Sequence, residues 1–176
     1  MQKEHPLRLF HFCPRCGSER FVERNEKAKS CRQCGFQYYN NISAAVAAFI
    51  LSPQGELLLC KRAKEPAKGL LDLTGGFVDS YETAEDAIKR EIKEELNLEV
   101  VNATYLFSIP NLYLYSDFTV HTLDLFYQVD IADFTTLRCD DDVADANFYA
   151  IDQIKIEDIG LQSIKTGVAR FIKNQI

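Results

Sequence analysis

The sequence contains no long hydrophobic segment and no excess of basic residues. Its longest apolar run, near residues 44–51, is far shorter than the roughly 20 residues that span a bilayer. Residues 1–7 lack a basic segment followed by an apolar core, the pattern typical of a secretory leader. We therefore expect a soluble, cytoplasmic protein without a membrane partner. A net charge of −6 and an isoelectric point near 5.1 also argue against a nucleic-acid partner, because general nucleic-acid binders are basic.

The chain also lacks internal repeats and low-complexity tracts. With 47% apolar and 26% charged residues among its 176, its composition is typical of one globular core with a small appendage. Asn40 and Asn41 mark the expected junction. We predict an N-terminal tail and cysteine-containing unit over residues 1–40 and a second domain over residues 41–176.

Four of the six cysteines form a pattern. Cys13-Pro-Arg-Cys16-Gly and Cys31-Arg-Gln-Cys34-Gly are two CxxC pairs with 14 residues between them. This spacing predicts a closed, four-cysteine zinc site in a ribbon, where each Gly permits a left-handed step after its turn. Zinc would supply folding energy that a segment of about 30 residues cannot obtain from its own core. Two disulfides are the alternative, which the missing secretory leader disfavours.

Residues 84–96 have a helical pattern with signals at both ends. Thr83 is a suitable N-cap, and acidic residues follow in the first turn, where they suit the helix dipole. The helix should therefore begin near Ala84. It should end near Leu96, because Asn97 tolerates the left-handed conformation that a C-terminal cap needs.

Three carboxylates share one surface of this predicted helix, beside an apolar stripe that includes Ile88 and Ile92. Glu91, Glu94 and Glu95 would repel one another in that arrangement. A divalent cation removes the repulsion, and Mg²⁺ or Mn²⁺ takes oxygen ligands while sharing its remaining positions with substrate phosphates. The pattern therefore predicts phosphoryl or pyrophosphoryl chemistry. An ordinary solvated, charged helix is the alternative.

The spacing of residues 76–98 carries a family resemblance. Five residues separate Gly76 from Glu82, and seven more separate Glu82 from the run Arg90-Glu91-Ile92, Glu94-Glu95 and Asn97-Leu98. This arrangement resembles the Nudix box of the Nudix hydrolases, which cleave a diphosphate linked to another moiety X. Asn97 stands where the family has Gly. Because Asn is the next most tolerant residue at positive φ, we expect the turn to be kept.

The resemblance implies a role for each matching residue. Glu94 would be the general base, with Glu91 and Arg90 beside it in the catalytic group. Glu82 would pair with Arg90 and fix the loop that carries Gly76 against the helix. The implied reaction is metal-assisted attack of water on phosphorus, with Mg²⁺ or Mn²⁺ as cofactor. The implied metal ligands are Glu91, Glu94, Glu95 and the Gly75 carbonyl.

The order of ribbon and box narrows the resemblance, because it is similar to that of the NADH pyrophosphatases, including the 14-residue gap between the cysteine pairs. Two features depart from that group. Only twelve residues precede Cys13, where the group has an extra domain. The group's Ser-Gln-Pro-Trp-Pro-Phe-Pro motif is matched only at Ser108 and Pro110. The resemblance therefore implies diphosphate hydrolysis with X undetermined, and a homodimer is expected because such relatives are often dimers.

Four further residues are candidates for the site. Arg62 lies in a basic loop ahead of the box and could hold substrate phosphates; plain solvated charges are the alternative. Asp142 matches the acid that completes the metal site in the relatives, and a solvated acidic loop is its alternative. Tyr113 and Tyr115 could stack on a nucleobase, although aromatic residues at alternating positions are more often core.

The remaining pattern predicts an α/β fold. Residues 42–51 read as a buried strand with residues 56–62 as its hairpin partner, and further strands are expected over residues 99–108, 118–130 and 146–151. A closing amphipathic helix contains Ile164, Val168, Phe171 and Ile172. With the fold that the resemblance implies, this gives an α/β/α sandwich around a curved mixed sheet, preceded by the ribbon.

Three functions remain open at this point. The first is hydrolysis of a nucleoside diphosphate linked to X, such as ADP-ribose or a dinucleotide like NADH or NAD. The second is hydrolysis of nucleoside triphosphates with release of pyrophosphate, as in pool-cleaning relatives. The third is a non-catalytic, Nudix-like ligand sensor or adaptor, which the retained box acids disfavour.

Overall fold

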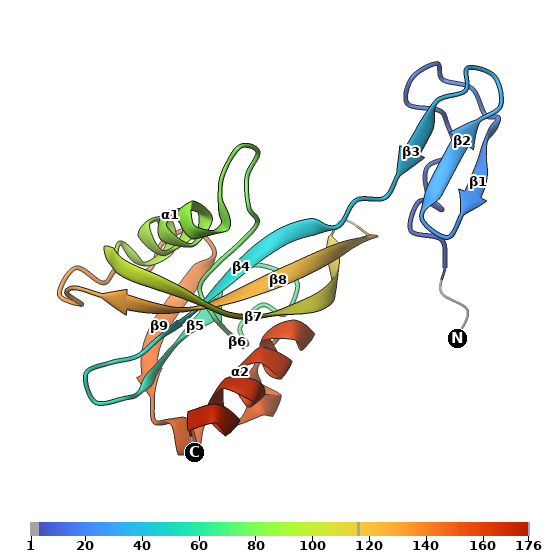
Figure 1. The fold of residues 1–176 in the computed structure, drawn as a ribbon. Coiled ribbons are helices and arrows are strands. Elements are labelled where there is room, and N and C mark those ends of the chain that lie inside the picture. The colour runs from blue at the N-terminus through green and yellow to red at the C-terminus, as the bar shows by residue number, and fades with distance from the viewer. Residues whose placement is uncertain (1–3, 116, 176) are drawn as a thin grey trace. The chain divides into compact units, whose positions relative to one another are not determined.

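The computed structural model describes residues 4–115 and 117–175; residues 1–3 of the expected N-terminal tail, residue 116 and residue 176 lie outside the described residues. The chain divides into two compact units, residues 1–42 and residues 43–176 (Figure 1). In the described part of the chain, no helix is both long enough and apolar enough to cross a membrane.

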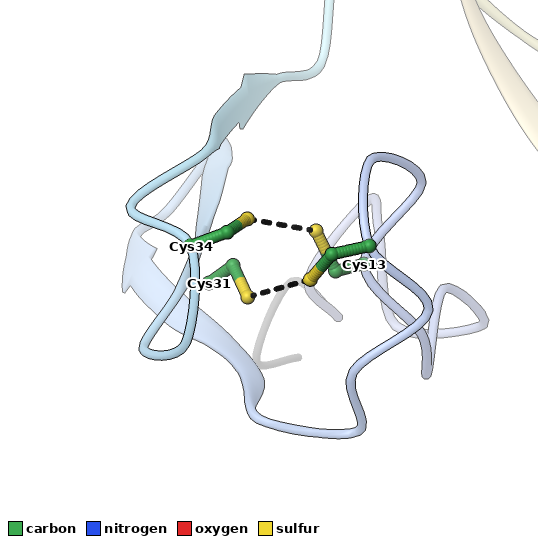
Figure 2. A group of neighbouring side chains, drawn as sticks. Cys13, Cys31 and Cys34 are labelled. Carbon is green, nitrogen blue, oxygen red and sulfur yellow. Dashed lines mark hydrogen bonds between the residues drawn. The ribbon is translucent and has the colours of Figure 1, made fainter.

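The first unit is a small antiparallel sheet with cysteine-bearing turns. Its strands follow one another in the order β1 (Phe21–Asn25), β2 (Ala28–Cys31) and β3 (Gln37–Tyr39). Each CxxC turn closes on its glycine: Gly17 donates its N–H to the Cys13 carbonyl at 2.8 Å and has φ +71°. Only a residue that adopts positive φ easily fits there, as the sequence pattern predicted. The two turns bring the cysteines face to face (Figure 2).

The second unit contains two three-stranded sheets and two α-helices. One sheet has the order β4 (Ser43–Ile50), β8 (Phe118–Ile131), β7 (Val100–Tyr115), with β4 parallel and β7 antiparallel to β8. The other is antiparallel and has the order β6 (Leu71–Asp72), β5 (Leu57–Arg62), β9 (Val143–Tyr149). The helices are α1 (Ala84–Leu96) and α2 (Gln162–Gln175), and two short 3-10 helices, η1 (Ile151–Gln153) and η2 (Ile156–Asp158), precede α2.

Strand β4 lies between the two layers of helix. Its side chains alternate between two hydrophobic clusters: Val46 packs in the cluster that contains α1, and Phe49 packs in the cluster that contains α2. The Phe49 and Phe171 rings stack with their centroids 4.1 Å apart. The predicted α/β/α sandwich, with Ile164, Val168 and Phe171 of the closing helix facing the sheets, is therefore confirmed.

The two strands and the turn of the predicted hairpin between β4 and β5 are present, with Ser52 N–H donating to Glu56 O at 2.8 Å, but the predicted pairing of the strands beyond that turn is wrong. The two strands belong to different sheets and share only the isolated bridge Leu51–Leu57. One edge of β4 is bonded to β8, and residues 74–78 occupy the other: Val46 N–H donates to Gly76 O at 2.8 Å and Ala48 N–H to Thr74 O at 3.0 Å. Both edges of β4 are therefore taken, and one of them positions the loop that leads into α1.

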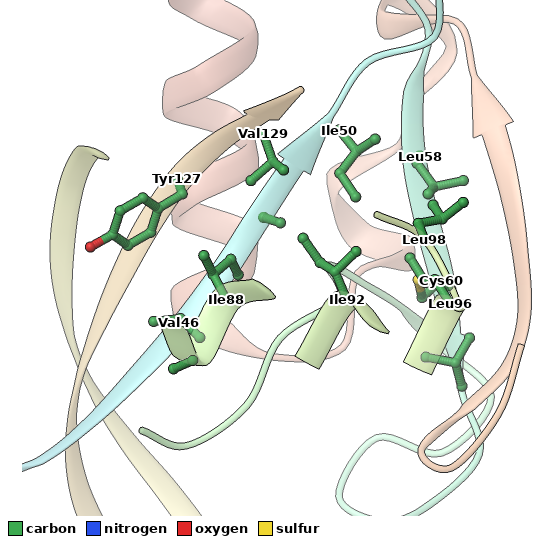
Figure 3. Packing of buried hydrophobic residues seen from close by; sticks show 13 residues of the cluster. Val46, Ile50, Leu58, Cys60, Ile88, Ile92, Leu96, Leu98, Tyr127 and Val129 are labelled. Carbon is green, nitrogen blue, oxygen red and sulfur yellow. The ribbon is translucent and has the colours of Figure 1, made fainter. Parts of the chain in front are cut away.

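Helix α1 has the bounds and caps that the sequence predicts. The Thr83 hydroxyl accepts the Asp86 N–H, and Asn97 has φ +55° while donating its N–H to the Lys93 carbonyl. Ile88, Ile92 and Leu96 are fully buried against β4 and its neighbours (Figure 3). Burying each such side chain is worth about 1.5–3 kcal/mol, so this stripe fixes which face of α1 stays available for the acids.

Strand β7 is longer than predicted. It continues past Ser108 to Tyr115 and pairs with β8 over its whole length, through Pro110 opposite Leu123. A strand tolerates Pro at a sheet edge because its missing N–H faces away from the ladder, and β7 is the edge strand of its sheet. The extension carries Tyr113 and Tyr115 out along the sheet that contains β4.

Candidate functional site

Four cysteine sulfurs of the first unit converge on one point. All four Sγ atoms lie within 4.8 Å of one another, and the pairs Cys13–Cys34 and Cys16–Cys31 are each 3.7 Å apart. A tetrahedral zinc with bonds of about 2.3 Å places its sulfurs about 3.8 Å apart, so this donor set fits the ion. The spacing is far longer than the disulfide bond of about 2.05 Å, and the four cysteines are free thiols.

The backbone around Cys31 favours its thiolate, whereas the neighbouring thiols raise the pKa of Cys16 to about 12 in spite of the Ser18 N–H. The N–H of Cys34 is the largest influence lowering the pKa of the Cys31 thiol to about 6, and the Gln33 N–H, 3.4 Å from Cys31 Sγ, acts in the same direction. Because the thiolate is the form that binds a metal, the turn prepares its own ligand.

The acidic site of the second unit begins with two glycines beside β4. Gly75 has φ +144°, and a Cβ on it would collide with the Val46 carbonyl. A Cβ on Gly76 would collide with the Glu91 carboxylate. These glycines therefore let the loop approach both β4 and α1 at backbone distance. Among the described residues, no N–H or side chain donates a hydrogen bond to the Gly75 carbonyl, so this oxygen remains available to a ligand.

Arg90 joins the loop to the helix. Its Nε donates to Glu82 Oε1 at 2.8 Å, and its Nη2 donates to Glu82 Oε2 and to the Phe77 carbonyl, both at 3.0 Å. Its Nη1 donates to Glu91 at 2.8 Å and to Glu94 at 3.1 Å. The Arg90 side chain lowers the pKa of Glu82, and these acids together raise the pKa of Arg90. One guanidinium therefore fixes the loop and holds two of the expected metal ligands.

On α1, Glu95 is buried and Glu91 is half-buried. Burial is the main cause that raises the pKa of Glu91, and it raises the pKa of Glu95 to about 8. Glu95 is only 6% exposed and accepts hydrogen bonds from the Thr74 hydroxyl at 2.5 Å and from the Gly75 N–H at 3.1 Å. The Glu91 charge raises the pKa of Glu95 further. A hard divalent cation fits such a pair, because it compensates both charges and accepts oxygen ligands.

The remaining expected ligands are less enclosed. Glu94 has a side chain that is 54% exposed, with Arg90 as its partner. The Asp142 side chain is 46% exposed and forms an ion pair with Lys64, which also contacts Asp141 at 2.9 Å. Within residues 4–115 and 117–175, no three acids bring carboxylate oxygens within 4.8 Å of one another. The acids are therefore neighbours but are not drawn together as the cysteines are.

A cavity of about 270 Å³ lies beside Glu95 and the two glycines. It also reaches Asp142, Arg62, Tyr113 and Tyr115, so one hollow collects candidates from four separate parts of the sequence. Four box residues do not line this cavity: Glu82, Arg90, Glu91 and Glu94. They lie where the loop meets α1, and Arg90 contacts the other three.

Inside the cavity, Arg62 is already engaged. Its Nη1 donates to Asp72 Oδ2 at 2.5 Å, and its Nε donates to the Pro66 carbonyl at 2.6 Å. Asp72 is only 6% exposed, and burial raises its pKa in spite of Arg62. The guanidinium therefore braces the loop over residues 63–70.

Sequence reasoning missed several residues of this site. Thr74 and Asp72 had no signal of their own, because their partners Glu95 and Arg62 are distant in sequence. Lys64 was one of several loop lysines until the fold brought Asp142 to it. Asp124 did carry a signal: it is a carboxylate on the strand face that also carries Val120 and Phe126.

Comparison with known proteins agrees with this geometry. A family profile described as "NUDIX domain" matches residues 42–170. Among curated proteins, the chain is 26% identical to the "NAD-capped RNA hydrolase NudC" of Pseudomonas aeruginosa over 147 residues, which cover 81% of this chain and 49% of the relative. It is 31% identical to the protein of that name from Vibrio vulnificus over 110 residues, which cover 62% of this chain and 41% of the relative. The chain thus spans about half the length of these relatives, or less.

Solved structures show the same fold. A NUDIX hydrolase from Nitrosomonas europaea matches with a TM-score of 0.72 at 21% identity, covering 93% of this chain and 91% of that one. The NUDIX domain of Shewanella oneidensis NrtR, solved with ADP ribose, matches with a TM-score of 0.62 at 16% identity, covering 78% of this chain and 91% of that one. At these identities the likeness concerns the fold alone.

Proposed function

This chain belongs to the NUDIX domain family, and on that premise we propose that it is a pyrophosphohydrolase: it hydrolyses the pyrophosphate bond of a nucleoside diphosphate linked to X in a reaction that depends on a divalent metal. One observation carries the proposal. The half-buried Glu91 and the buried Glu95 flank a two-glycine loop whose Gly75 carbonyl is available, and this group adjoins a cavity with aromatic side chains at its wall.

The chain's own residues have distinct roles in this proposal. Glu91, Glu94, Glu95, Asp142 and the Gly75 carbonyl would hold Mg²⁺ or Mn²⁺, whose bound form would neutralise developing charge and acidify water. Glu94 is the exposed acid beside the other ligands, so it is suited to take a proton from the attacking water. Arg90 positions Glu91 and Glu94 and, through Glu82, the loop. Lys64, displaced from Asp142, would be free to bind a substrate phosphate.

We propose a dinucleotide of the NAD type, or ADP-ribose, as the substrate. The support comes from the curated relatives, which are named NAD-capped RNA hydrolases, and from Tyr113 and Tyr115 at the cavity, where they suit a flat ring. The ribbon would hold a structural zinc through its four thiols, and a thiolate site of this kind suits a reducing, cytoplasmic compartment. We also propose a homodimer, because the proteins that this chain resembles are often dimers.

The test is an end-point hydrolysis panel with Mg²⁺ and with Mn²⁺, covering NADH, NAD, ADP-ribose, ADP-sugars and the nucleoside triphosphates, with products resolved. We expect two monophosphates from the preferred substrate. Nucleoside monophosphate plus pyrophosphate would instead identify a triphosphate pyrophosphohydrolase. No turnover in any reaction, with the protein folded and zinc retained, would contradict the proposal and favour a ligand sensor.

A further inference from the structure

The cavity has a polar inner wall that diphosphate hydrolysis does not require. Asp124 and Thr122 on β8 are 6% and 3% exposed, and both line the cavity together with Asn111 of β7. The Thr122 hydroxyl donates to Asp124 Oδ1 at 2.6 Å, and the Asn111 amide donates to Asp124 Oδ2 at 3.0 Å. Thr122 pairs directly with Asn111 across the two strands, so the sheet register places the three side chains next to one another.

Asp124 is a buried carboxylate with only neutral partners. Among the described residues, no ion pair includes it, and Arg62, the guanidinium in the same cavity, is bound to Asp72 and the Pro66 carbonyl. A buried charge without a cation is costly, and its two internal hydrogen bonds leave each oxygen with further acceptor capacity. The cavity therefore presents an oriented acceptor to whatever fills it.

The neighbouring walls suit a flat ring. Phe77 and Tyr113 meet edge to face with their ring centroids 5.9 Å apart, and both line the cavity. Ala45, paired in register with Asp124, and Leu161 provide apolar surface. A volume of about 270 Å³ is close to the lower end of the range for small-molecule sites. Aromatic and apolar walls beside the buried Asp124 acceptor are the surroundings that a heteroaromatic ring with an N–H donor needs.

We infer that Asp124 is a specificity-determining residue that accepts a hydrogen bond from an amine or amide N–H on the ring of the bound nucleotide. Thr122 and Asn111 act as positioning residues, because they fix the carboxylate without turning it away from the cavity. The inference rests on the proposed function, since it concerns the ring at one end of the same substrate. The N–H has two sources, the exocyclic amine of a nucleobase or the carboxamide of a nicotinamide.

Calorimetric titration of the intact, zinc-containing protein without added Mg²⁺ or Mn²⁺ tests this inference separately from turnover. The probes are two matched pairs: AMP against purine riboside 5′-monophosphate, which lacks the amine and has no ring N–H, and nicotinamide mononucleotide against nicotinic acid mononucleotide, which lacks the amide N–H. The donor member of one pair should bind about 10-fold tighter or more, as expected for one hydrogen bond to a charged group. The pair that shows the preference identifies the source of the N–H.

Asp124→Asn should reduce that preference to about 3-fold or less. Asp130→Asn is the matched control, because Asp130 is exposed on the same strand and also accepts an amide hydrogen bond, from Asn102 at 3.3 Å. If Asp124→Asn fails to fold, Thr122→Val keeps the carboxylate but removes its orienting hydroxyl, and it should reduce the preference about 3-fold.

No preference in either pair, or a preference that survives the folded variant, would overturn the inference. Hydrolysis without ring preference would overturn this inference alone. Selective binding without hydrolysis would support the inference while removing the proposed catalytic function.

Discussion

The two clusters of candidate metal ligands in this protein differ in how they are assembled. In the first unit, four sulfurs lie within 4.8 Å of one another and match the edges of a zinc tetrahedron. In the second unit, no three described carboxylates approach so closely, because Arg90 holds Glu91 and Glu94 and Lys64 holds Asp142. The ribbon's sulfurs are thus already placed as an ion would need them, whereas the acidic site is balanced by the chain's own cations.

This difference is the one expected from the tasks that we propose for the two sites. A structural zinc site uses all four positions for protein ligands, and its binding energy is folding energy. A catalytic Mg²⁺ site keeps positions for water and substrate, so its ligands need not be complete before the substrate arrives. The following variants should separate these two behaviours.

Cys13→Ser should have the largest effect, because the ribbon has only a small hydrophobic cluster of its own, around Phe21. We expect zinc content to fall from about one per chain to near zero. Amide signals of residues 4–42 should collapse while those of residues 43–175 stay dispersed in a two-dimensional NMR spectrum. Cys139→Ser is the control, since Cys139 lies outside the cluster. If Cys13→Ser retained its zinc, or if both units unfolded together, the distinction between the ribbon and the acidic site would be contradicted.

Glu94→Gln should reduce kcat by about 10²- to 10⁴-fold, the range for removing a general base. The side chain is 54% exposed, so the melting temperature should change little. Glu99→Gln is the matched control on an exposed acid that pairs with Lys93 at 2.7 Å, and it should leave turnover unchanged. Normal turnover in Glu94→Gln would remove this residue from the mechanism.

Arg90→Lys should lower kcat/KM by about 10-fold and the melting temperature by about 2–8 °C. An ammonium cannot reproduce the fork that reaches Glu82, Glu91, Glu94 and the Phe77 carbonyl together. Arg138→Lys, on an exposed arginine 3.7 Å from Asp140, is the comparison. Equal behaviour of the two variants would show that Arg90 does not organise the acidic site.

The smallest expected effect is a pH dependence from Glu95. Its pKa is raised in the folded protein from 4.5 to about 8, so the folded state holds the proton more tightly than the unfolded chain. Stability from this group is therefore present below pH 4.5 and is lost as the pH rises to about 8. Without added Mg²⁺, the melting temperature of Glu95→Gln relative to wild type should rise by a few degrees between pH 5 and pH 9. If the difference in melting temperature between Glu95→Gln and wild type does not change with pH, Glu95 is not a buried, protonated carboxyl.

The features that the sequence predicted well are local. Helix α1 begins and ends where Thr83 and Asn97 indicate, because capping is decided within four residues of each end. Each of the two CxxC turns is equally local, since each closes through its own glycine. These interactions need no knowledge of the rest of the fold.

The features that the sequence did not reveal depend on distant pairing. Residues 74–78 displaced β5 from the edge of β4, and no residue of β5 carries a mark of this competition. The Arg62–Asp72 pair and the Thr74–Glu95 hydrogen bond join segments that only the folded chain brings together. The candidate site was thus predicted as a set of residues with the Glu82–Arg90 pair, whereas its cavity and the pairs Arg62–Asp72 and Lys64–Asp142 were not.

The most direct test of the account compares turnover with metal content in the same sample. Protein that retains about one zinc per chain should not hydrolyse its preferred diphosphate substrate until Mg²⁺ or Mn²⁺ is added. Turnover should then appear with two monophosphates as products and with the zinc content unchanged. Turnover that proceeds without added Mg²⁺ or Mn²⁺ and follows the zinc content would contradict the account, because it would place the chemistry in the ribbon.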